Sequence, residues 1–264
     1  QLDIGNFFNS INRRKLFALL QARINKDLRR PRRDRRRCDA GEARAMLWLA
    51  RVLLTGNPAQ TAVFNGRPGD LQRVPVHKQL RHAPAETGLP IGNLTSQFFA
   101  NVYLNELDQF IKHQLKVRYY VRYVDDFVLL HDSSQQLQQW RAEIVHFLSD
   151  RLALRLRDDG ILAPVRQGID FLGYILRPDY LLVRQRVLSH LYDKLVVMRK
   201  QWLHADGSLH CCPENVERLH AVLASYWGHF AHAQSRNIRQ AVLRSHPWLG
   251  YWLREDTAKE VLKR

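Results

Sequence analysis

The stretch Tyr123-Val124-Asp125-Asp126 constrains the fold more than any other part of the chain. The segments on both sides of it, residues 118–122 and 127–131, are rich in aromatic and β-branched residues, a composition typical of strands in a buried sheet. The two carboxylates lie where a tight turn would join an antiparallel hairpin. Such a pair is commonly no more than a solvated turn. Adjacent acids repel each other unless a cation lies between them, so a divalent metal is the natural partner.

A third carboxylate stands near the start of the printed sequence. Asp3 follows an apolar residue and precedes two Phe residues and a helix, for which Asn9 or Asn12 can provide the N-terminal cap. Alone, Asp3 could be a helix-cap acid. An acid that ends a strand beside an Asp-Asp hairpin turn is also what a two-metal nucleotidyl-transfer site requires, with two Mg²⁺ ions about 4 Å apart.

A glycine-rich turn gives the third motif. Gly88-Leu89-Pro90-Ile91-Gly92 indicates a rigid turn with an exposed backbone, and Thr95 or Ser96 then begins a helix with apolar residues at helical spacing. Glycine in this turn lets a nucleotide or a base pair approach the backbone closely. A Gly-Pro turn before a helix is commonplace on its own. The order of the three motifs along the chain (Asp3, then the glycine-rich turn, then the Asp-Asp pair) is a stronger signal than any one of them.

Together with residues 168–174 (Gly-Ile-Asp-Phe-Leu-Gly-Tyr), these stretches resemble the palm of a reverse transcriptase. Residues 91–97 narrow the resemblance to the reverse transcriptases of diversity-generating retroelements, because most reverse transcriptases carry Gln in place of Ile91 and Pro in place of Gln97. Residues 225–233 are similar to the thumb of the same group. The resemblance covers nearly the whole chain.

The resemblance implies an RNA-directed DNA polymerase for mutagenic retrohoming, with Asp3, Asp125 and Asp126 as catalytic residues. Asp3 and Asp125 would hold two Mg²⁺ ions, or Mn²⁺, with the Ile4 carbonyl as an added ligand and Asp126 in weaker support. The metals would stabilise charge on the transferred phosphoryl group. A Lys expected beside residues 158–160, to protonate pyrophosphate, is missing. Arg155 or Arg157 could contribute charge there, but arginine is a poor acid.

The resemblance also assigns contacts with deoxynucleoside triphosphates. The Phe8 ring would lie beneath the sugar and exclude a 2′-hydroxyl by steric clash, and Phe7 would offer its backbone N–H to the triphosphate. Ile91 and Gly92, with Gln97, would touch the nascent base pair. Isoleucine lacks the amide that Gln offers there, which predicts weaker rejection of mismatches. Alternatively, Ile91 only packs the turn.

We expect an α+β fold, an antiparallel split-βαβ palm sheet with helices on one face, followed by an all-helical thumb. The palm, with residual fingers elements, would span residues 1–184 and the thumb residues 185–264. Phe171-Leu172-Gly173-Tyr174 matches the primer grip, although it could be an ordinary core strand. The thumb would hold an RNA template and a primer by their phosphates, through Lys194, Arg199, Lys200, Arg236, Arg239 and Arg244.

The coarse pattern predicts the remaining elements. Helices are expected over residues 43–55, 133–152, 187–202, 213–230 and 235–246, strands over 153–157 and 169–176, and an extended hairpin over 61–82. Trp227, Trp248 and Trp252 are expected to pack in a core rather than to serve as platforms on which bases stack.

The charge balance favours a polyanionic partner. Forty-one Lys and Arg residues against 25 Asp and Glu residues give a net charge of +16, which suits nucleic acid better than a ribosome-like or membrane-surface role. The run of residues 29–37 is typical of a solvated loop, with phosphate contact as the alternative. No signal peptide and no apolar run of about 20 residues is found, so we expect a cytoplasmic protein without a membrane partner.

The three cysteines do not form a disulfide framework. Cys211 and Cys212, with His204 and His210 nearby, lack the two-residue gap and the second cysteine pair of a zinc site, so a loop is the better interpretation.

The sequence begins at the catalytic strand, without the fingers region that grips the triphosphate. We therefore expect a fragment or a truncated frame that binds primer-template but extends it poorly. The alternatives are a catalytically silent nucleic-acid-binding remnant and a group II intron or retron polymerase, against which Ser96-Gln97 argues. An RNA-dependent RNA polymerase would carry a small residue in place of Phe8. An accessory protein is a further expected partner.

Overall fold

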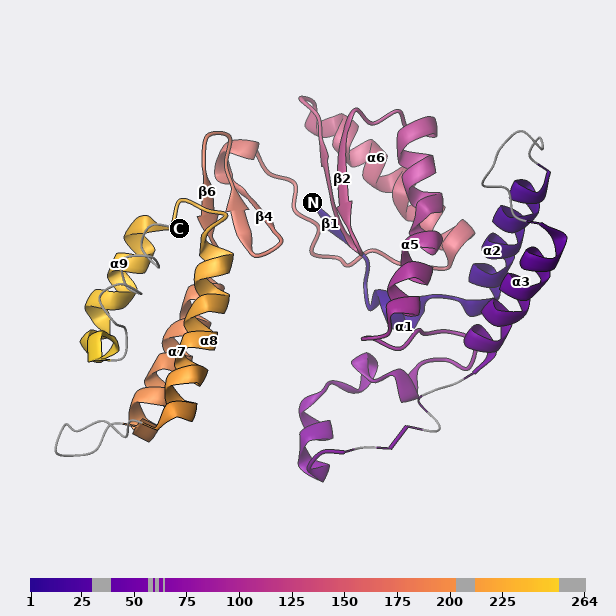
Figure 1. Ribbon diagram of the computed structural model, residues 1–264. Helices are drawn as coiled ribbons and strands as arrows, with labels where there is room; N and C mark the ends of the chain where they lie inside the picture. Colours follow the sequence, from indigo (N-terminus) through magenta and orange to yellow (C-terminus); the bar gives the residue numbers. More distant parts are fainter. Residues whose placement is uncertain (30–38, 57–58, 60–61, 64, 203–211, 252–264) are drawn as a thin grey trace. The chain divides into compact units, whose positions relative to one another are not determined.

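The computed structural model describes residues 1–29, 39–56, 59, 62–63, 65–202 and 212–251 (Figure 1). The chain divides into two compact units, Gln1–Leu162 and Ala163–Arg264. The division lies upstream of the palm–thumb boundary predicted after residue 184, because the second small sheet groups with the helices that follow it. The assignment of palm and thumb to these residues stays a prediction.

The first unit combines one three-stranded antiparallel sheet with several helices. The strand order is β1-β3-β2. Its elements are β1 (Leu2–Asp3), α1 (Phe7–Ser10), α2 (Arg13–Leu28), α3 (Ala40–Thr55), the short 3₁₀ helices η1 (Pro68–Arg73), η2 (Val76–Lys78) and η3 (Leu80–His82), α5 (Leu94–Gln109) with its π-helical extension η4 (Phe110–Gln114), β2 (Tyr119–Tyr123), β3 (Asp126–Leu130), and α6 (Ser134–Phe147) with its π-helical extension η5 (Leu148–Leu152).

Helix α5 supplies much of the core of this unit. Phe99, Tyr103, Leu107 and Ile111 recur every four residues, so they share one face of the helix, and the last three are completely buried. Phe127 of β3 is completely buried in the same cluster. Each such side chain contributes about 1.5–3 kcal/mol by leaving water. This packing fixes the sheet against α5.

Side-chain caps begin the helices close to where the sequence predicts them. Asn12 accepts a hydrogen bond from the Lys15 N–H at the start of α2, and Ser133 accepts one from the Gln136 N–H at the start of α6. Helix α3 begins three residues earlier than predicted, because Asp39 and Glu42 form a capping box.

The second unit holds a three-stranded antiparallel sheet and a helical region. Its elements are β4 (Ile169–Phe171), β5 (Tyr174–Leu176), β6 (Leu181–Val183), α7 (Gln185–Trp202), α8 (Pro213–Phe230), α9 (Arg236–Ser245) and the 3₁₀ helix η7 (Pro247–Tyr251), with η6 (Val165–Gln167) before the sheet. The predicted core positions of Trp227 and Trp248 are confirmed, since these residues are 5% and 6% exposed. Trp252 lies outside the described residues.

The extended hairpin predicted over residues 61–82 is wrong for the described part of that range. The structure has the 3₁₀ helices η1, η2 and η3 there instead. Pro68 and Pro75 explain the difference, because proline fixes φ and removes the N–H that a strand ladder needs.

Two strand predictions also need correction. Residues 153–157 form only an isolated bridge, Ile4↔Leu156, because Ala153 takes a left-handed conformation (φ 51°) and strand β1 is only two residues long. Residues 169–176 are not one strand. They form the hairpin β4–β5, which turns at Leu172 (φ 55°) and Gly173 (φ 85°).

The observed mixture of helices and small antiparallel sheets agrees with the α+β class. Within the described residues, no helix has the length and apolar character needed to cross a membrane. Most of the basic run (residues 30–37) and three of the four residues considered for zinc (His204, His210 and Cys211) lie outside the described residues; Cys212 is a free cysteine.

Candidate active site

The Asp-Asp motif forms the predicted hairpin turn. Strands β2 and β3 pair in antiparallel register up to Tyr123↔Asp126, so only Val124 and Asp125 lie in the turn. Val124 has a φ of 55°, a left-handed conformation that β-branched residues rarely adopt. Asp125 lies half-buried at the end of the hairpin, while Asp126 begins strand β3.

Strand β1 brings the third acid to the same end of the sheet. Asp3 lies opposite Asp126 in the β1–β3 register, and directly opposed residues have Cβ atoms about 4.5–5.5 Å apart. The Ile4 N–H donates to the Asp125 carbonyl oxygen at 3.2 Å. The structure therefore brings together Asp3, Asp125 and Asp126 (hereafter the three carboxylates), although Asp3 and Asp125 lie far apart in the sequence.

The three carboxylates create an excess of negative charge. Burial raises the pKa of Asp125, and the charges of Asp3 and Asp126 raise it further, while the Arg157 guanidinium opposes this rise. A bound cation would relieve the same repulsion. Carboxylate oxygens are the hard ligands that Mg²⁺ prefers, so the donor chemistry of these residues fits a divalent metal.

Two polar side chains hold the carboxylates in this structure. Arg157 Nη1 lies 2.8 Å from Asp3 Oδ2, and Arg157 Nη2 lies 2.5 Å from Asp159 Oδ2. Gln1 Nε2 donates to both Asp126 carboxylate oxygens at 3.0 and 3.1 Å. Among the described residues, no three His, Cys, Asp or Glu side chains are arranged so that they could hold a metal ion. For a metal to bind here, Asp3 would have to give up its ion pair with Arg157 and bind the cation instead.

The turn that begins at Gly88 is hydrogen-bonded to helix α1. The Gly88 N–H donates to the Ile11 carbonyl at 2.9 Å, and the Leu89 N–H donates to the Phe8 carbonyl at 2.8 Å. Phe7 is buried, and its ring contacts the half-buried Phe8 ring edge-on. Two of the predicted motifs, the one that follows Asp3 and the glycine-rich turn, are thus joined directly.

The predicted base-pair contacts lie on an open surface. Ile91 is 75% exposed and Gln97 is exposed. Gly92 has a φ of 105°, and a Cβ atom there would meet nothing within 4 Å. The alternative that Ile91 only packs the turn is not supported, because its side chain is largely in solvent. A ligand can reach the backbone at Gly92.

The predicted primer grip forms the tip of the β4–β5 hairpin in the second unit. Phe171 is buried, Leu172 is 48% exposed, and Tyr174 stacks on His229 at a centroid distance of 4.4 Å. The Tyr174 hydroxyl donates to the His229 carbonyl oxygen at 2.8 Å. The hairpin is therefore anchored on helix α8, and its tip remains exposed.

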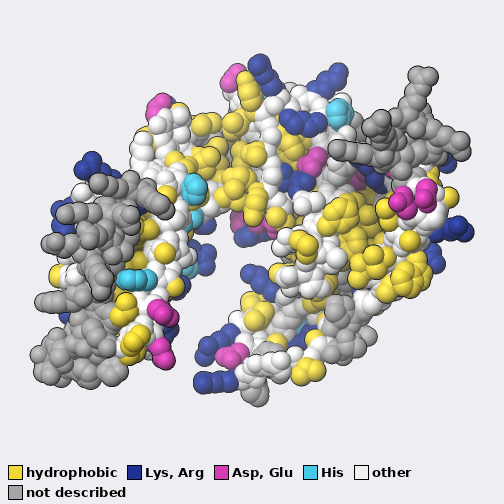
Figure 2. All heavy atoms as spheres, in the orientation of Figure 1, with side chains coloured by type: hydrophobic (Ala, Val, Ile, Leu, Met, Phe, Trp, Pro, Cys, Tyr) yellow, Lys and Arg dark blue, Asp and Glu magenta, His cyan; other side chains and the backbone are white. Residues whose placement is uncertain are grey.

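The predicted phosphate contacts of the second unit differ in exposure. Five of them, Lys194, Arg199, Lys200, Arg236 and Arg244, are exposed. Arg239 is only 4% exposed, and its guanidinium donates to the Trp227 carbonyl oxygen at 3.3 Å. Its burial contradicts a phosphate contact. Figure 2 shows Lys and Arg side chains spread over the visible surfaces of both units.

Some residues beside the site were missed by reasoning from the sequence. No sequence pattern points to Gln1, and the sequence indicates Arg157 only as a source of charge near the pyrophosphate. Arg122 donates to the backbone of the turn itself. A signal for Arg122 exists in the sequence, because a charged residue occupies an otherwise apolar and aromatic strand.

The site thus combines a hairpin that carries two acids, a neighbouring strand that carries a third, and a glycine turn that is open at Gly92. This arrangement agrees with a nucleotidyltransferase. Residues 1–176 match the family model described as reverse transcriptase (RNA-dependent DNA polymerase). The chain belongs to this family, which confirms the broader resemblance; the diversity-generating type stays a prediction. Among curated proteins, no sequence matches the chain.

The raised pKa of Asp125 predicts a pH-dependent effect on stability. Between the ordinary value of 3.8 and the higher pKa in the fold, the folded state binds more protons than the unfolded state, so stability falls as pH rises. In the metal-free protein, Asp125→Asn should therefore raise the free energy of unfolding at pH 7, and the gain should vanish as pH falls below about 4.

Denaturant unfolding at pH 7 and at acidic pH measures this difference, with the exposed Asp132→Asn as the matched control. Added Mg²⁺ should reduce the gain, because it stabilises only the wild-type site. A destabilised Asp125→Asn protein at pH 7 would contradict the electrostatic account.

Proposed function

We propose that the chain is an RNA-directed DNA polymerase that adds deoxynucleotides to a primer 3′ end by two-metal nucleotidyl transfer, in a diversity-generating retroelement. The observation that carries the proposal is the position of Asp3, Asp125 and Asp126 at one end of the β1-β3-β2 sheet, in a chain of the reverse transcriptase family. The retroelement type rests on Ile91 and Gln97, which differ from the residues of most reverse transcriptases.

In this proposal Asp3 and Asp125 hold two Mg²⁺ ions, or Mn²⁺, with the Ile4 carbonyl as an added ligand. The bound ions supply Lewis-acid stabilisation of the transferred phosphoryl group. Asp126 supports the site more weakly, in keeping with its two hydrogen bonds from Gln1. Arg157 would have to release Asp3 for a metal to be held there, because both would compete for the same carboxylate.

The incoming deoxynucleotide is bound by the segment that follows strand β1. Phe8 restricts the space beneath the sugar, and the Phe7 N–H binds the triphosphate. Ile91, Gly92 and Gln97 contact the new base pair, which agrees with the open backbone at Gly92.

The partners proposed are an RNA template, a DNA or RNA primer and a retroelement accessory protein, in the cytoplasm. The exposed basic residues of α7 and α9 bind the phosphates of the duplex, and the β4–β5 hairpin tip (residues 171–174) holds the primer end. A net charge of +16 favours such contacts.

A catalytically silent nucleic-acid-binding protein is the second candidate. It is favoured by Arg157, which occupies Asp3, and by the lack of a three-ligand metal arrangement among the described residues. The two candidates differ in one measurable property, the extension of a primer.

Primer extension with Mg²⁺ tests the proposal in the complete reading frame that contains these residues. Asp125→Asn should lower the extension rate by more than about 100-fold, because it removes stabilisation of transition-state charge. Affinity for primer-template should change little, and Asp132→Asn should extend like the wild type. A wild-type protein that binds primer-template without extending it would establish the silent alternative, and an active Asp125→Asn variant would refute the metal assignment.

Phe8→Ala should relax discrimination between sugars. Removal of the ring opens space for a 2′-hydroxyl, so the ratio of ribonucleotide to deoxynucleotide incorporation should rise by about 10- to 200-fold. Phe8→Tyr, which retains the ring, is the matched control and should preserve the wild-type preference. Single-nucleotide incorporation kinetics with both substrates measure the ratio. Equal ratios in Phe8→Ala and the wild type would mean that another residue excludes the 2′-hydroxyl.

Ile91→Gln should lower misincorporation opposite template adenine. The amide restores a polar contact, whereas isoleucine discriminates by shape alone, and the difference should be on the order of 10-fold. Leu94→Gln is the matched control, because Leu94 is also exposed at the start of α5. Equal error rates in a folded Ile91→Gln protein would remove Ile91 from the account of fidelity.

A further inference from the structure

The turn that carries Asp125 is conformationally unfavourable. Val124 adopts a φ of 55°, and a β-branched side chain in this region clashes with its own backbone. Such a conformation persists only where surrounding contacts hold it. The contacts around Val124 therefore show what keeps Asp125 in place.

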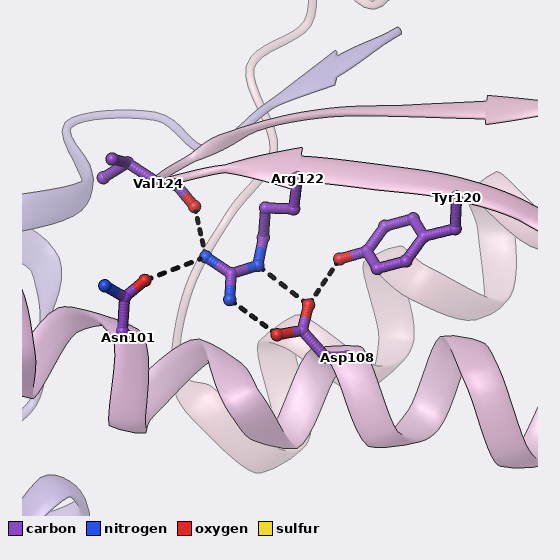
Figure 3. Close-up of polar contacts among 5 residues, drawn as sticks. All are labelled: Asn101, Asp108, Tyr120, Arg122 and Val124. Carbon is purple, nitrogen blue, oxygen red and sulfur yellow. Dashed lines mark hydrogen bonds and ion pairs between the residues drawn. The ribbon is translucent and has the colours of Figure 1, made fainter.

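One contact reaches the turn from the helix-facing side of strand β2. Arg122 Nη1 donates to the Val124 carbonyl oxygen at 2.8 Å (Figure 3). That oxygen belongs to the peptide group that joins Val124 to Asp125. Its direction therefore fixes the orientation of the backbone from which the Asp125 side chain extends.

Arg122 is itself anchored on helix α5. Its Nε and Nη2 atoms lie 2.8 and 2.6 Å from the two carboxylate oxygens of Asp108, a bidentate ion pair, and Nη1 also lies 3.4 Å from Asn101 Oδ1. The side chains of Arg122 and Asp108 are only 11% and 27% exposed. Because the pair is largely shielded from solvent, salt screens it weakly.

A tyrosine completes the anchor. The Tyr120 hydroxyl donates to Asp108 Oδ1 at 2.7 Å. Burial raises the pKa of Tyr120, and the hydrogen bond to Asp108 raises it further, so the hydroxyl stays protonated and continues to donate. Asp108 is thus held from two positions on the same strand, and Arg122 has little freedom to move.

We infer that Arg122 is a positioning residue for catalysis: anchored on Asp108, it holds the Val124 carbonyl and so fixes the direction of the Asp125 carboxylate. This inference rests on the proposed function. Lysine could not replace it, because a single ammonium group cannot span Asp108 and the turn at once, whereas the planar guanidinium donates to both.

Arg122→Lys tests the inference. It retains the charge that Asp108 requires but loses the contact with the Val124 carbonyl. The kcat of primer extension should fall by about 100-fold, the loss that a small misplacement of a reacting group causes, with nearly unchanged primer-template affinity and a higher Mg²⁺ requirement. Asp108→Asn, a second variant, should lower kcat in the same direction because it weakens the anchor. The shift in Mg²⁺ requirement separates positioning from a general loss of stability.

Two comparisons sharpen the test. Arg13→Lys is the matched control, because Arg13 donates to the Gly56 carbonyl at 3.0 Å elsewhere in the same unit, and its kcat should match the wild type. Val124→Gly should partly restore kcat in the Arg122→Lys background, since glycine adopts positive φ without a clash. Wild-type kcat and Mg²⁺ dependence in a folded Arg122→Lys protein would overturn the inference, and so would a loss that Val124→Gly does not relieve.

Failure of the proposed function gives a different result. In that case the wild type itself extends no primer, and the backbone conformation of Val124 tests the inference in place of kcat. NMR scalar couplings report the φ of Val124 in the wild type and in Arg122→Lys. A change from positive φ in the variant supports the positioning role, and an unchanged φ overturns it.

Discussion

Repulsion among Asp3, Asp125 and Asp126 is the constraint on which the rest of the site depends. The β1–β3 register and the Val124–Asp125 turn force these acids together, and the buried cluster around Phe127 and Ile4 holds the strands in that register. Hydrophobic burial elsewhere and the ion pair of Asp3 with Arg157 offset the mutual repulsion of the three acids. The pKa of Asp125 is raised first by its burial and then by the charges of Asp3 and Asp126.

The two faces of the β1-β3-β2 sheet differ in how deeply their charged side chains are buried. On the face toward helix α5, Arg122 and Asp108 neutralise each other and are largely buried. Asp3 and Asp126, as opposed residues, share the other face with Tyr123, which is 58% exposed. A largely buried ion pair thus supports the turn from within the fold, while the contacts of Asp3 with Arg157 and of Asp126 with Gln1 lie nearer the solvent. A cation and a nucleotide would approach the outward face, and the inward face supplies rigidity.

Local patterns in the sequence predict the parts of the fold that local chemistry determines. The hairpin at Asp125 follows from strand composition and turn residues, and the helices that begin near Asn12 and Ser133 follow from caps. The strand prediction for residues 61–82 is wrong because Pro68 and Pro75 lack the N–H that a strand ladder needs. Local patterns do not predict the burial of Arg239 or the Arg122–Asp108 ion pair. Both depend on which helix packs against the side chain, and the spacing of residues along the sequence does not determine that packing.

Arg157 supplies positive charge beside the three carboxylates when no metal is bound. Its backbone N–H donates to the Asp3 carbonyl at 2.8 Å, so the residue is fixed beside the acid, while its half-exposed side chain bridges Asp3 and Asp159. If a cation bound Asp3, as the proposed mechanism requires, the guanidinium would keep Asp159 as a partner. The exchange would replace one positive charge beside Asp3 with another. An exposed ion pair is suited to this exchange because solvent screens it, whereas the largely buried Arg122–Asp108 pair could not be opened without leaving a charge unpaired in the protein interior.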